Sequence, residues 1–380
     1  MPSNIVISSL TPETVKTGIT PFIATRADLR DGSRPTTDGA IFSDSFNYAD
    51  WTSGLPENDL GNPTGFPDTE QRVTAGNTLP GDWDSCRQAP TFADSVGFTG
   101  GAEAVEILSA NSAMARSNGK CFVGLRESVP EPNWFWGSES ALWKNLGQDY
   151  TSLYVEFWIK FSDNWTTTPS NPNNDWSSKI FRIGSWSGSG SEFQNFEGGE
   201  NGPILFWNYQ NNKFGVRNLV QLRGGPHGDN YRLDFATDWP DKPVRNGTSF
   251  NWTTDQQGQA PGGTDPQIVD LVNGGFLLDN PSQTVTHEQV FGTQYNKMAF
   301  YVEMNSDPAL TDGKLKQWFN GQRILNSTQI RWCKDSLVGW NFFEIGGNDF
   351  FKEYPQDQQR QERYAIDDIV VRETIPAGLE

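Results

Sequence analysis

The sequence predicts an all-β protein, a sandwich of two antiparallel sheets, and three observations carry this prediction. Apolar and polar side chains alternate with a period of two in several segments, as in strands that bury one face. The chain contains 25 Phe, 15 Trp and 9 Tyr but 4 Met, and its 38 Gly and 23 Pro separate the apolar runs. No internal repeat and no long amphipathic helix interrupts this pattern. A single all-β domain accommodates a chain of 380 residues.

Strand signals follow one another through most of the chain. The clearest alternation lies in LYVEFWIKF at 153–161, with Phe157 on the aliphatic side and Trp158 on the aromatic and charged side. KLKQWFNGQRIL at 314–325 is typical of a hairpin with an Asn-Gly turn. The other expected strands are IFSDSFNYADW from Ile41, AEAVEILSA (102–110), KCFVGLRES (120–128), SKIFRIGSW (178–186), PILFWNYQ (203–210), FGVRNLVQLR (214–223), KMAFYVEM (297–304), WNFFEIGG (340–347) and YAIDDIVVRE (364–373).

The alternation also predicts a presented face opposite the core. Each strand buries an aliphatic row and displays an aromatic and charged row, a combination that suits sugar rings and their hydroxyl groups. The alternative is that some of the displayed Trp residues are buried under long loops as a second small core. The residues predicted to bind carbohydrate are Tyr154, Glu156, Trp158, Arg182, Trp186, Trp207, Tyr209, Arg223, Tyr301 and Glu303.

The domain organisation follows from where the strand signals begin and end. Residues 1–40 are rich in Thr, Pro and Ser and read as an extended arm or linker, either a loose terminus or a segment that docks onto a partner. Residues 41–374 form the predicted domain, and residues 375–380 form a C-terminal tail. The start of the chain lacks the basic and apolar regions of a signal peptide.

Charge and cysteine content exclude several classes of function. The formal net charge of −18 and the isoelectric point near 4.5 disfavour nucleic acid and anionic membranes as partners. No apolar stretch approaches the roughly 20 residues that would span a bilayer. Three cysteines and two histidines make a zinc site improbable. A Cys86–Cys121 disulfide and free thiols are both compatible with this content.

Four segments together resemble concanavalin A-like jelly rolls, a superfamily that includes laminin G-like modules and several polysaccharide lyase families. They are FSDSF, LYVEFWIKFSDNW, DGKLKQWFNGQRI and AIDDIVV, and the resemblance covers roughly 41–374. It implies two curved sheets, a concave face lined by the presented row, and first and last strands side by side. It also implies a structural Ca²⁺ near the terminal strands, with Asp44, Asp367 and Asp368 as ligands. The alternative for these acids is edge charges that discourage aggregation.

Three chemistries suit such a face. β-Elimination on an acidic polysaccharide needs cations for the uronate carboxylate and a base, and the basic stretch 213–232 offers Arg217, Gln221, His227 and Tyr231. The R-x-E-L-R and Q-I-H signatures of lyase families are absent from it. Glycoside hydrolysis needs two carboxylates, for which Glu156 and Glu303 are the candidates, although the E-x-D-x-x-E run of jelly-roll hydrolases is absent. Binding without chemistry needs the presented face alone.

The sequence therefore predicts a carbohydrate-binding jelly-roll protein, with a polysaccharide lyase as the alternative. The Thr- and Pro-rich arm, the acidic surface and the start without a signal peptide fit a phage virion surface component, a capsid decoration or a tail adhesin. Such a protein would be made in the host cytoplasm and would meet other virion proteins through residues 1–40. The competing expectation is a secreted polysaccharide-degrading enzyme without its leader.

Overall fold

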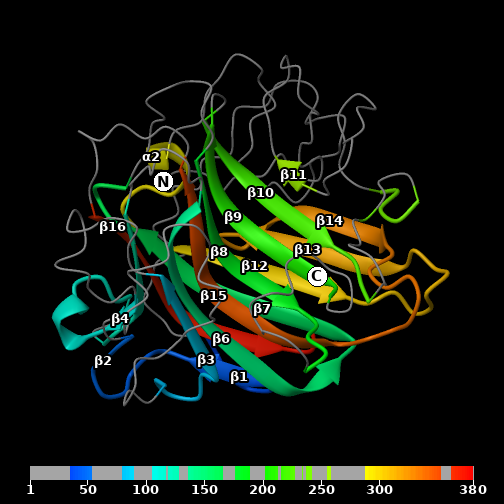
Figure 1. Cartoon of the computed structure of the whole chain (residues 1–380), viewed down its shortest axis with the longest axis horizontal. Coiled ribbons are helices and arrows are strands. Elements are labelled where there is room, and N and C mark those ends of the chain that lie inside the picture. The colour runs from blue at the N-terminus through cyan, green and yellow to red at the C-terminus, as the bar shows by residue number, and fades with distance from the viewer. Residues whose placement is uncertain are drawn as a thin grey trace.

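The computed structural model shows a β-sandwich (Figure 1). One short helix, α2 (His287–Val290), and one 3-10 turn, η3 (Ser109–Asn111), accompany the strands that the structure describes. No helix in this part of the chain is long and apolar enough to cross a membrane. The described residues are 35–53, 79–89, 105–116, 119–127, 136–165, 176–188, 202–212, 215–226, 233, 237–241, 255–257, 287–351 and 361–379.

Nine of the described strands form one sheet, which we call sheet A. Their order is β14-β13-β12-β7-β16-β5-β4-β2, and β1 pairs with β16 beside this path. The bounds are β1 (Phe42–Asp44), β2 (Trp51–Thr52), β4 (Val105–Ile107), β5 (Phe122–Glu127), β7 (Ser152–Phe161), β12 (Asn296–Glu303), β13 (Gly313–Phe319), β14 (Gln322–Ile330) and β16 (Gln361–Arg372).

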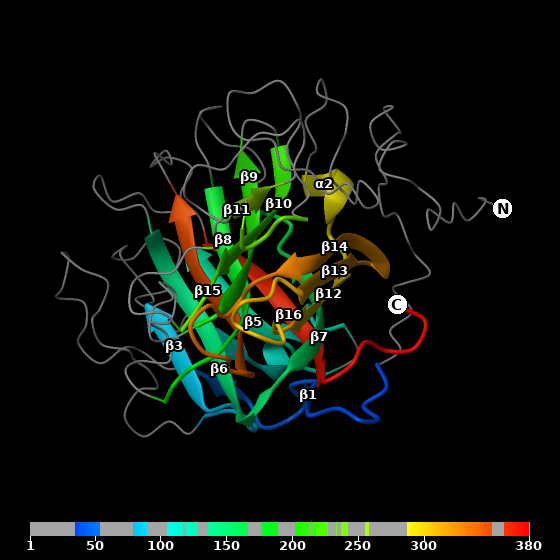
Figure 2. The same cartoon turned by 90° about the vertical axis from the view of Figure 1, so that its right-hand side faces the viewer.

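The other seven described strands form sheet B, which lies against sheet A as a second layer (Figure 2). Their order is β11-β10-β9-β8-β15-β6-β3. The bounds are β3 (Ser85–Ala89), β6 (Trp136–Tyr150), β8 (Trp176–Gly184), β9 (Ile204–Asn212), β10 (Gly215–Arg223), β11 (Asp255–Gln257) and β15 (Trp340–Phe351).

This architecture confirms the predicted all-β jelly-roll sandwich. The described strand pairs are antiparallel, and the first strand lies beside the last, with Phe42 opposite Val371. The predicted hairpin is present between β13 and β14. Its turn residues Asn320 and Gly321 have φ values of 50° and 78°, the left-handed conformation that an Asn-Gly turn favours.

The apolar rows of the two sheets meet in one core. Phe157 of β7 packs on Phe181 of β8 at 4.9 Å between ring centroids, and Phe181 stacks on Phe300 of β12 at 5.1 Å. All three side chains are fully buried. Burying one such side chain stabilises the fold by roughly 1.5–3 kcal/mol, so this inner row holds the two sheets together.

The predicted single presented face is wrong, because its residues belong to two sheets. β7 and β12 lie in sheet A, whereas β8, β9 and β10 lie in sheet B, so their displayed rows point away from each other on opposite sides of the sandwich. Alternation assigns residues to the two faces of a strand, but it does not say which strands share a sheet.

Trp207 and Tyr209 were also predicted on the presented face, and this prediction is wrong. The Trp207 ring lies 6.3 Å from the rings of both Phe157 and Phe300, and Tyr209 lies 5.2 Å from Phe161. Both side chains therefore belong to the core between the sheets. The strand is apolar on both sides, so its sequence does not reveal which side faces inward.

The three cysteines are free thiols in the structure. Cys86 belongs to the main core, whereas Cys121 belongs to a separate cluster on the far side of sheet A. Burial raises the pKa of Cys121 to about 12 and that of Cys333 to about 11. Neither thiol is therefore a thiolate nucleophile near neutral pH.

Strand β15 approaches β6 closely at Gly346, which lies opposite Ala141. Gly346 has φ of 84°, and a Cβ there would overlap the carbonyl oxygen of Ser140. Gly321 has a similar φ of 78°, but no described atom lies within 4 Å of the Cβ position. A side chain would therefore meet backbone strain at both positions, but steric overlap only at Gly346.

We expect Gly346→Ala to lower the free energy of unfolding by more than about 3 kcal/mol, because both strain and overlap act there. Gly321→Ala, the matched control, should cost about 1–2 kcal/mol, because strain acts alone. Urea denaturation of the two variants measures both values. Equal losses would show that β15 is not packed against β6 in this register.

Candidate functional site

The outer face of sheet A is covered by other parts of the same chain. The Tyr154 hydroxyl donates to Glu156 Oε2 at 2.6 Å, and Lys297 Nζ lies 2.7 Å from the same oxygen. The Arg116 guanidinium lies 4.0 Å from the centre of the Trp158 ring. Tyr154, Glu156 and Trp158 are all buried, at 0, 4 and 6% exposure. These three predicted binding residues therefore contact other parts of the chain and are buried from solvent.

The C-terminal tail closes the other half of this face. Ile375 and Leu379 pack on a cluster that contains Tyr154, Tyr301 and Trp318. The Trp318 indole donates to the Leu379 carbonyl at 3.2 Å. Tyr301 is 9% exposed, so it is not displayed to solvent as the sequence predicted. Glycan recognition on sheet A would require the tail to leave.

Glu156 and Glu303 do not form a hydrolase pair. Glu303 lies opposite Ser152 on β7, four residues before Glu156, which corresponds to about 13 Å along the strand. Glycosidases place their two carboxyl groups about 5–10 Å apart. In addition, Lys314 Nζ lies 2.8 Å from Glu303 Oε1, so each carboxylate has its own lysine partner.

The predicted calcium ligands are engaged by protein donors. Asp44 accepts hydrogen bonds from the Phe46 N–H at 2.6 Å and the Trp83 indole at 2.8 Å. Asp368 forms an ion pair with Arg116. Among the described residues, no three His, Cys, Asp or Glu side chains gather closely enough to hold a metal ion. This arrangement does not fit a Ca²⁺ site, and structural calcium stays a prediction.

The outer face of sheet B has an aromatic part. Trp143 of β6, Phe206 of β9 and Phe342 of β15 pack together with Ala141 and Ile204 on the side away from the core. Trp186, just beyond β8, meets Trp143 edge to face at 5.3 Å between ring centroids. Trp186 is half-buried, whereas Trp143 is 3% exposed. Trp186 is therefore the ring of this cluster that solvent reaches.

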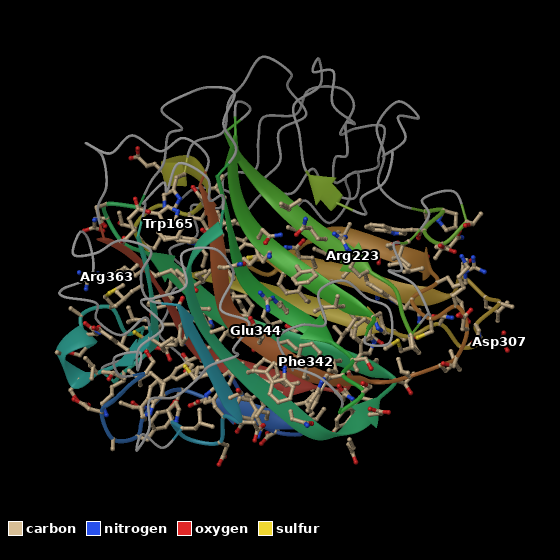
Figure 3. All side chains as sticks on the ribbon, in the orientation of Figure 1. Trp165, Arg223, Asp307, Phe342, Glu344 and Arg363 are labelled. Atoms are coloured by element: carbon tan, nitrogen blue, oxygen red, sulfur yellow. The ribbon has the colours of Figure 1, made fainter. Side chains whose placement is uncertain are left out.

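Polar side chains occupy the adjacent part of the same outer face. Arg182 of β8 forms a buried ion pair with Glu344 of β15, at 2.7 Å, and its guanidinium lies 5.4 Å from the Phe206 ring centre. The Asn208 side-chain amide donates to Gln221 Oε1 at 2.9 Å. Figure 3 labels Glu344 and Phe342 along β15 and Arg223 at β10. Arg182 and Arg223 were predicted on the presented face, and both belong to sheet B.

Several buried polar atoms of this face have no hydrogen-bond partner within the part of the chain that the structure describes. They include Arg182 Nε, Asn208 Oδ1, Asn348 Oδ1 and Trp143 Nε1. A buried polar group without a partner costs about 1–3 kcal/mol. A polar ligand that supplied partners would recover part of this cost. The outer face of sheet A also holds such atoms, for example Asn326 Oδ1 and Arg372 Nε, but the C-terminal tail packs on that face. The outer face of sheet B is therefore the better candidate for ligand binding.

An open pocket lies at the end of this face, and we call it the Trp186 pocket. Its volume is about 370 Å³, at the lower end of the range for small-molecule sites. Trp186 supplies an aromatic surface, and amides, hydroxyls and one carboxylate supply hydrogen-bonding groups. The lining residues are Asn145, Gly147, Gln148, Asp149, Ser185, Trp186, Ser187, Gly188, Gly202, Val338 and Asn341.

The Asn341 side chain positions Trp186 in this pocket. Its Oδ1 accepts the Trp186 backbone N–H at 2.8 Å, and its Nδ2 donates to the Trp186 carbonyl at 3.0 Å. The same Nδ2 donates to Asp149 Oδ1 at 2.8 Å. The backbone pairing of β15 with β8 begins one residue further on, at Phe342 and Gly184. The Asn341 amide thus replaces a backbone pair and ties three elements together at the pocket.

A second pocket of about 540 Å³ lies where β1 meets β3 and β6. It shares Asn145 and Gly147 with the Trp186 pocket. Its Lys144 and Asp84 form an ion pair at 2.8 Å, and Lys144 also lies 5.8 Å from the Phe42 ring centre. Its lining residues are Ile41, Phe42, Asp84, Trp143, Lys144, Asn145, Leu146 and Gly147.

The predicted lyase residues are only partly described. Gln221 lies on the outer face of sheet B, where Asn208 binds it. Arg217 lies in β10 opposite Gln210, and its side chain falls outside the described residues. His227 and Tyr231 also fall outside them. None of the described Tyr or His side chains joins the aromatic and polar groups of this face.

The sequence predicted Trp186 but missed its polar surroundings. Asn145, Gln148, Asp149 and Asn341 lie at the ends of strands, where side-chain alternation no longer carries information. A concentration of Asn, Gln and Asp around the junction of two strands was the available signal, in the run KNLGQDY at 144–150. Such runs are also typical of ordinary turns, so the signal has low specificity.

No protein-family model and no curated protein matches the chain. Solved structures similar to it include an endo-β-1,4-glucuronan lyase from the fungus Trichoderma reesei, with 13% identity, a TM-score of 0.42, and 77% of this chain and 91% of that chain covered. A PL-14 alginate lyase from Aplysia kurodai has 8% identity and a TM-score of 0.40, covering 71% and 87%. The Emp46p carbohydrate recognition domain has 11% identity and a TM-score of 0.31, covering 67% and 89%.

The buried Asp367 predicts a pH dependence of stability. Burial, followed by the nearby negative charge of Asp368, raises the pKa of the Asp367 carboxyl to about 7. The folded state therefore holds a proton that the unfolded state releases near pH 4. Stability contributed by this proton is present below about pH 4 and is lost as the pH rises through about 7.

We expect the free energy of unfolding to fall between about pH 4.5 and pH 7.5, with a slope from Asp367 of up to about 1.4 kcal/mol per pH unit. Asp367→Asn should flatten this slope. Denaturation of both proteins across the pH range measures the difference. Parallel curves for the two proteins would show that Asp367 does not hold the proton.

Proposed function

We propose that this protein binds a glycan in the Trp186 pocket and along the adjoining outer face of sheet B. The observation that carries the proposal is the position of Trp186. Its indole is half-buried and fixed from behind by Trp143 and Asn341, and it borders an open pocket with amide, hydroxyl and carboxylate groups. Sugar rings stack their C–H faces on indoles and hydrogen-bond to such groups. A fixed aromatic ring loses little entropy on binding.

Replacing Trp186 by Ala should weaken glycan binding at least about tenfold, because the stacking surface is lost. Trp51→Ala is the matched control, since Trp51 is also half-buried but lies in β2 of sheet A, outside both pockets. Retention on immobilised glycans and cell-envelope fractions, followed by isothermal titration, measures the effect. Equal retention of the two variants would refute the proposed site, provided that both melt near the wild-type temperature.

A polysaccharide lyase is the second candidate. It is supported by Gln221 and Arg223 on β10, because the chain runs directly from this strand into the basic segment that contains His227 and Tyr231. β-Elimination needs a cation near the uronate carboxylate and a base near the C5 proton. The described residues of the outer face supply cations but no Tyr or His. The lyase proposal therefore depends on these two residues.

Incubation with alginate, glucuronan, heparinoid and pectin tests elimination through the ultraviolet absorbance of the unsaturated ends. If the protein is a lyase, His227→Ala or Tyr231→Phe should lower the rate at least about a hundredfold. Their folding is checked by the melting temperature. If no substrate yields unsaturated ends, the lyase proposal fails for these polymers and glycan binding without catalysis is the function that stands. Whichever of the two functions holds, the location of the protein on a virion surface stays a prediction.

A further inference from the structure

The described lining of the Trp186 pocket carries a negative charge, which affects the kind of sugar residue that the pocket can bind. Among the described residues that line the pocket, Asp149 is the single ionisable one, and it is exposed. Asp149 Oδ1 accepts a hydrogen bond from Asn341, so the carboxylate is held at the pocket wall beside Trp186. No Lys, Arg or His belongs to the described residues that line the pocket.

Two described cations on the strands beside the pocket, Lys144 and Arg182, already pair with carboxylates. Lys144 pairs with Asp84 at 2.8 Å and lines the second pocket. Arg182 pairs with Glu344 and is 3% exposed. A carboxylate placed in the Trp186 pocket would therefore meet a negative charge and, among the described lining residues, no positive charge to balance it. Two like charges about 4 Å apart weaken binding about fivefold even in bulk water, and more where water is excluded.

We infer that the sugar residue held in the Trp186 pocket is a neutral or amino sugar and not a uronate. This inference rests on the proposed glycan binding at the same pocket. Amide and hydroxyl groups on the walls donate to and accept from sugar hydroxyls, which a neutral residue supplies. An amino sugar adds a cation that Asp149 attracts. The net charge of −18 also repels acidic polymers, which favours the same preference.

Pairs of polysaccharides test the inference. Each pair consists of a uronate-containing polymer, such as glucuronan, alginate or pectate, and the same polymer after its carboxylates have been reduced to primary alcohols. Chitosan oligosaccharides represent the amino sugars. Binding is measured for the wild type, for Trp186→Ala to establish use of the pocket, and for Asp149→Asn, which removes the charge and keeps the shape.

In each pair that shows binding, the wild type should bind the reduced polymer at least about fivefold more tightly than the acidic polymer. Asp149→Asn should shrink this ratio at least about threefold, and raised salt should shrink it in the wild type. Asp163→Asn is the matched control, because Asp163 is exposed and lies outside both pockets. This control should leave the ratio as in the wild type.

Two outcomes overturn the inference, and they are distinguishable. If an acidic member binds as tightly as its reduced partner or more tightly, and Trp186→Ala abolishes its binding, the glycan site stands but its preference is wrong. If no polymer shows binding that depends on Trp186, the proposed function fails and the inference fails with it.

Discussion

The alternation of side chains along each strand determines both the core and the site of this protein. In sheet A it turns Phe157 and Phe300 inward, and in sheet B it turns Phe181 and Trp207 inward, so that the rings meet between the sheets. The same pleat turns Arg182 and the neighbouring aromatic residues to the opposite side. Because the inner rows are large and closely packed, the outer rows have no freedom to exchange places with them.

The two outer faces then differ in what covers them. On sheet A, the C-terminal tail and the segment around Arg116 pack on the aromatic residues, and lysines pair with Glu156 and Glu303. On sheet B, an open pocket begins beside Trp186. Both outer faces hold buried polar atoms without a hydrogen-bond partner among the described residues, such as Arg372 Nε on sheet A and Asn208 Oδ1 on sheet B. The two faces therefore differ in whether other parts of the chain cover them. The contrast places the candidate site on sheet B.

Much of the fold could be predicted from local sequence. The hairpin at Asn320-Gly321, the strands with clear alternation and the pairing of the first strand with the last are confirmed. The prediction of one presented face failed because sheet membership depends on pairing between distant segments, such as β15 between β6 and β8. Trp207 was misplaced because both sides of its strand are apolar. The role of Asn341 was missed because a single amide near the start of a strand has no periodic signature.

The central claim is that ligand recognition lies at Trp186 on sheet B and not on sheet A. The most direct measurement is a titration of the indole N–H signals by nuclear magnetic resonance with a bound glycan. The signal of Trp186 should move first and most, and that of Trp143 should follow because the two rings are in contact. Shifts confined to Trp158 and Trp318, with Trp186 unchanged, would place the ligand on sheet A and contradict the account.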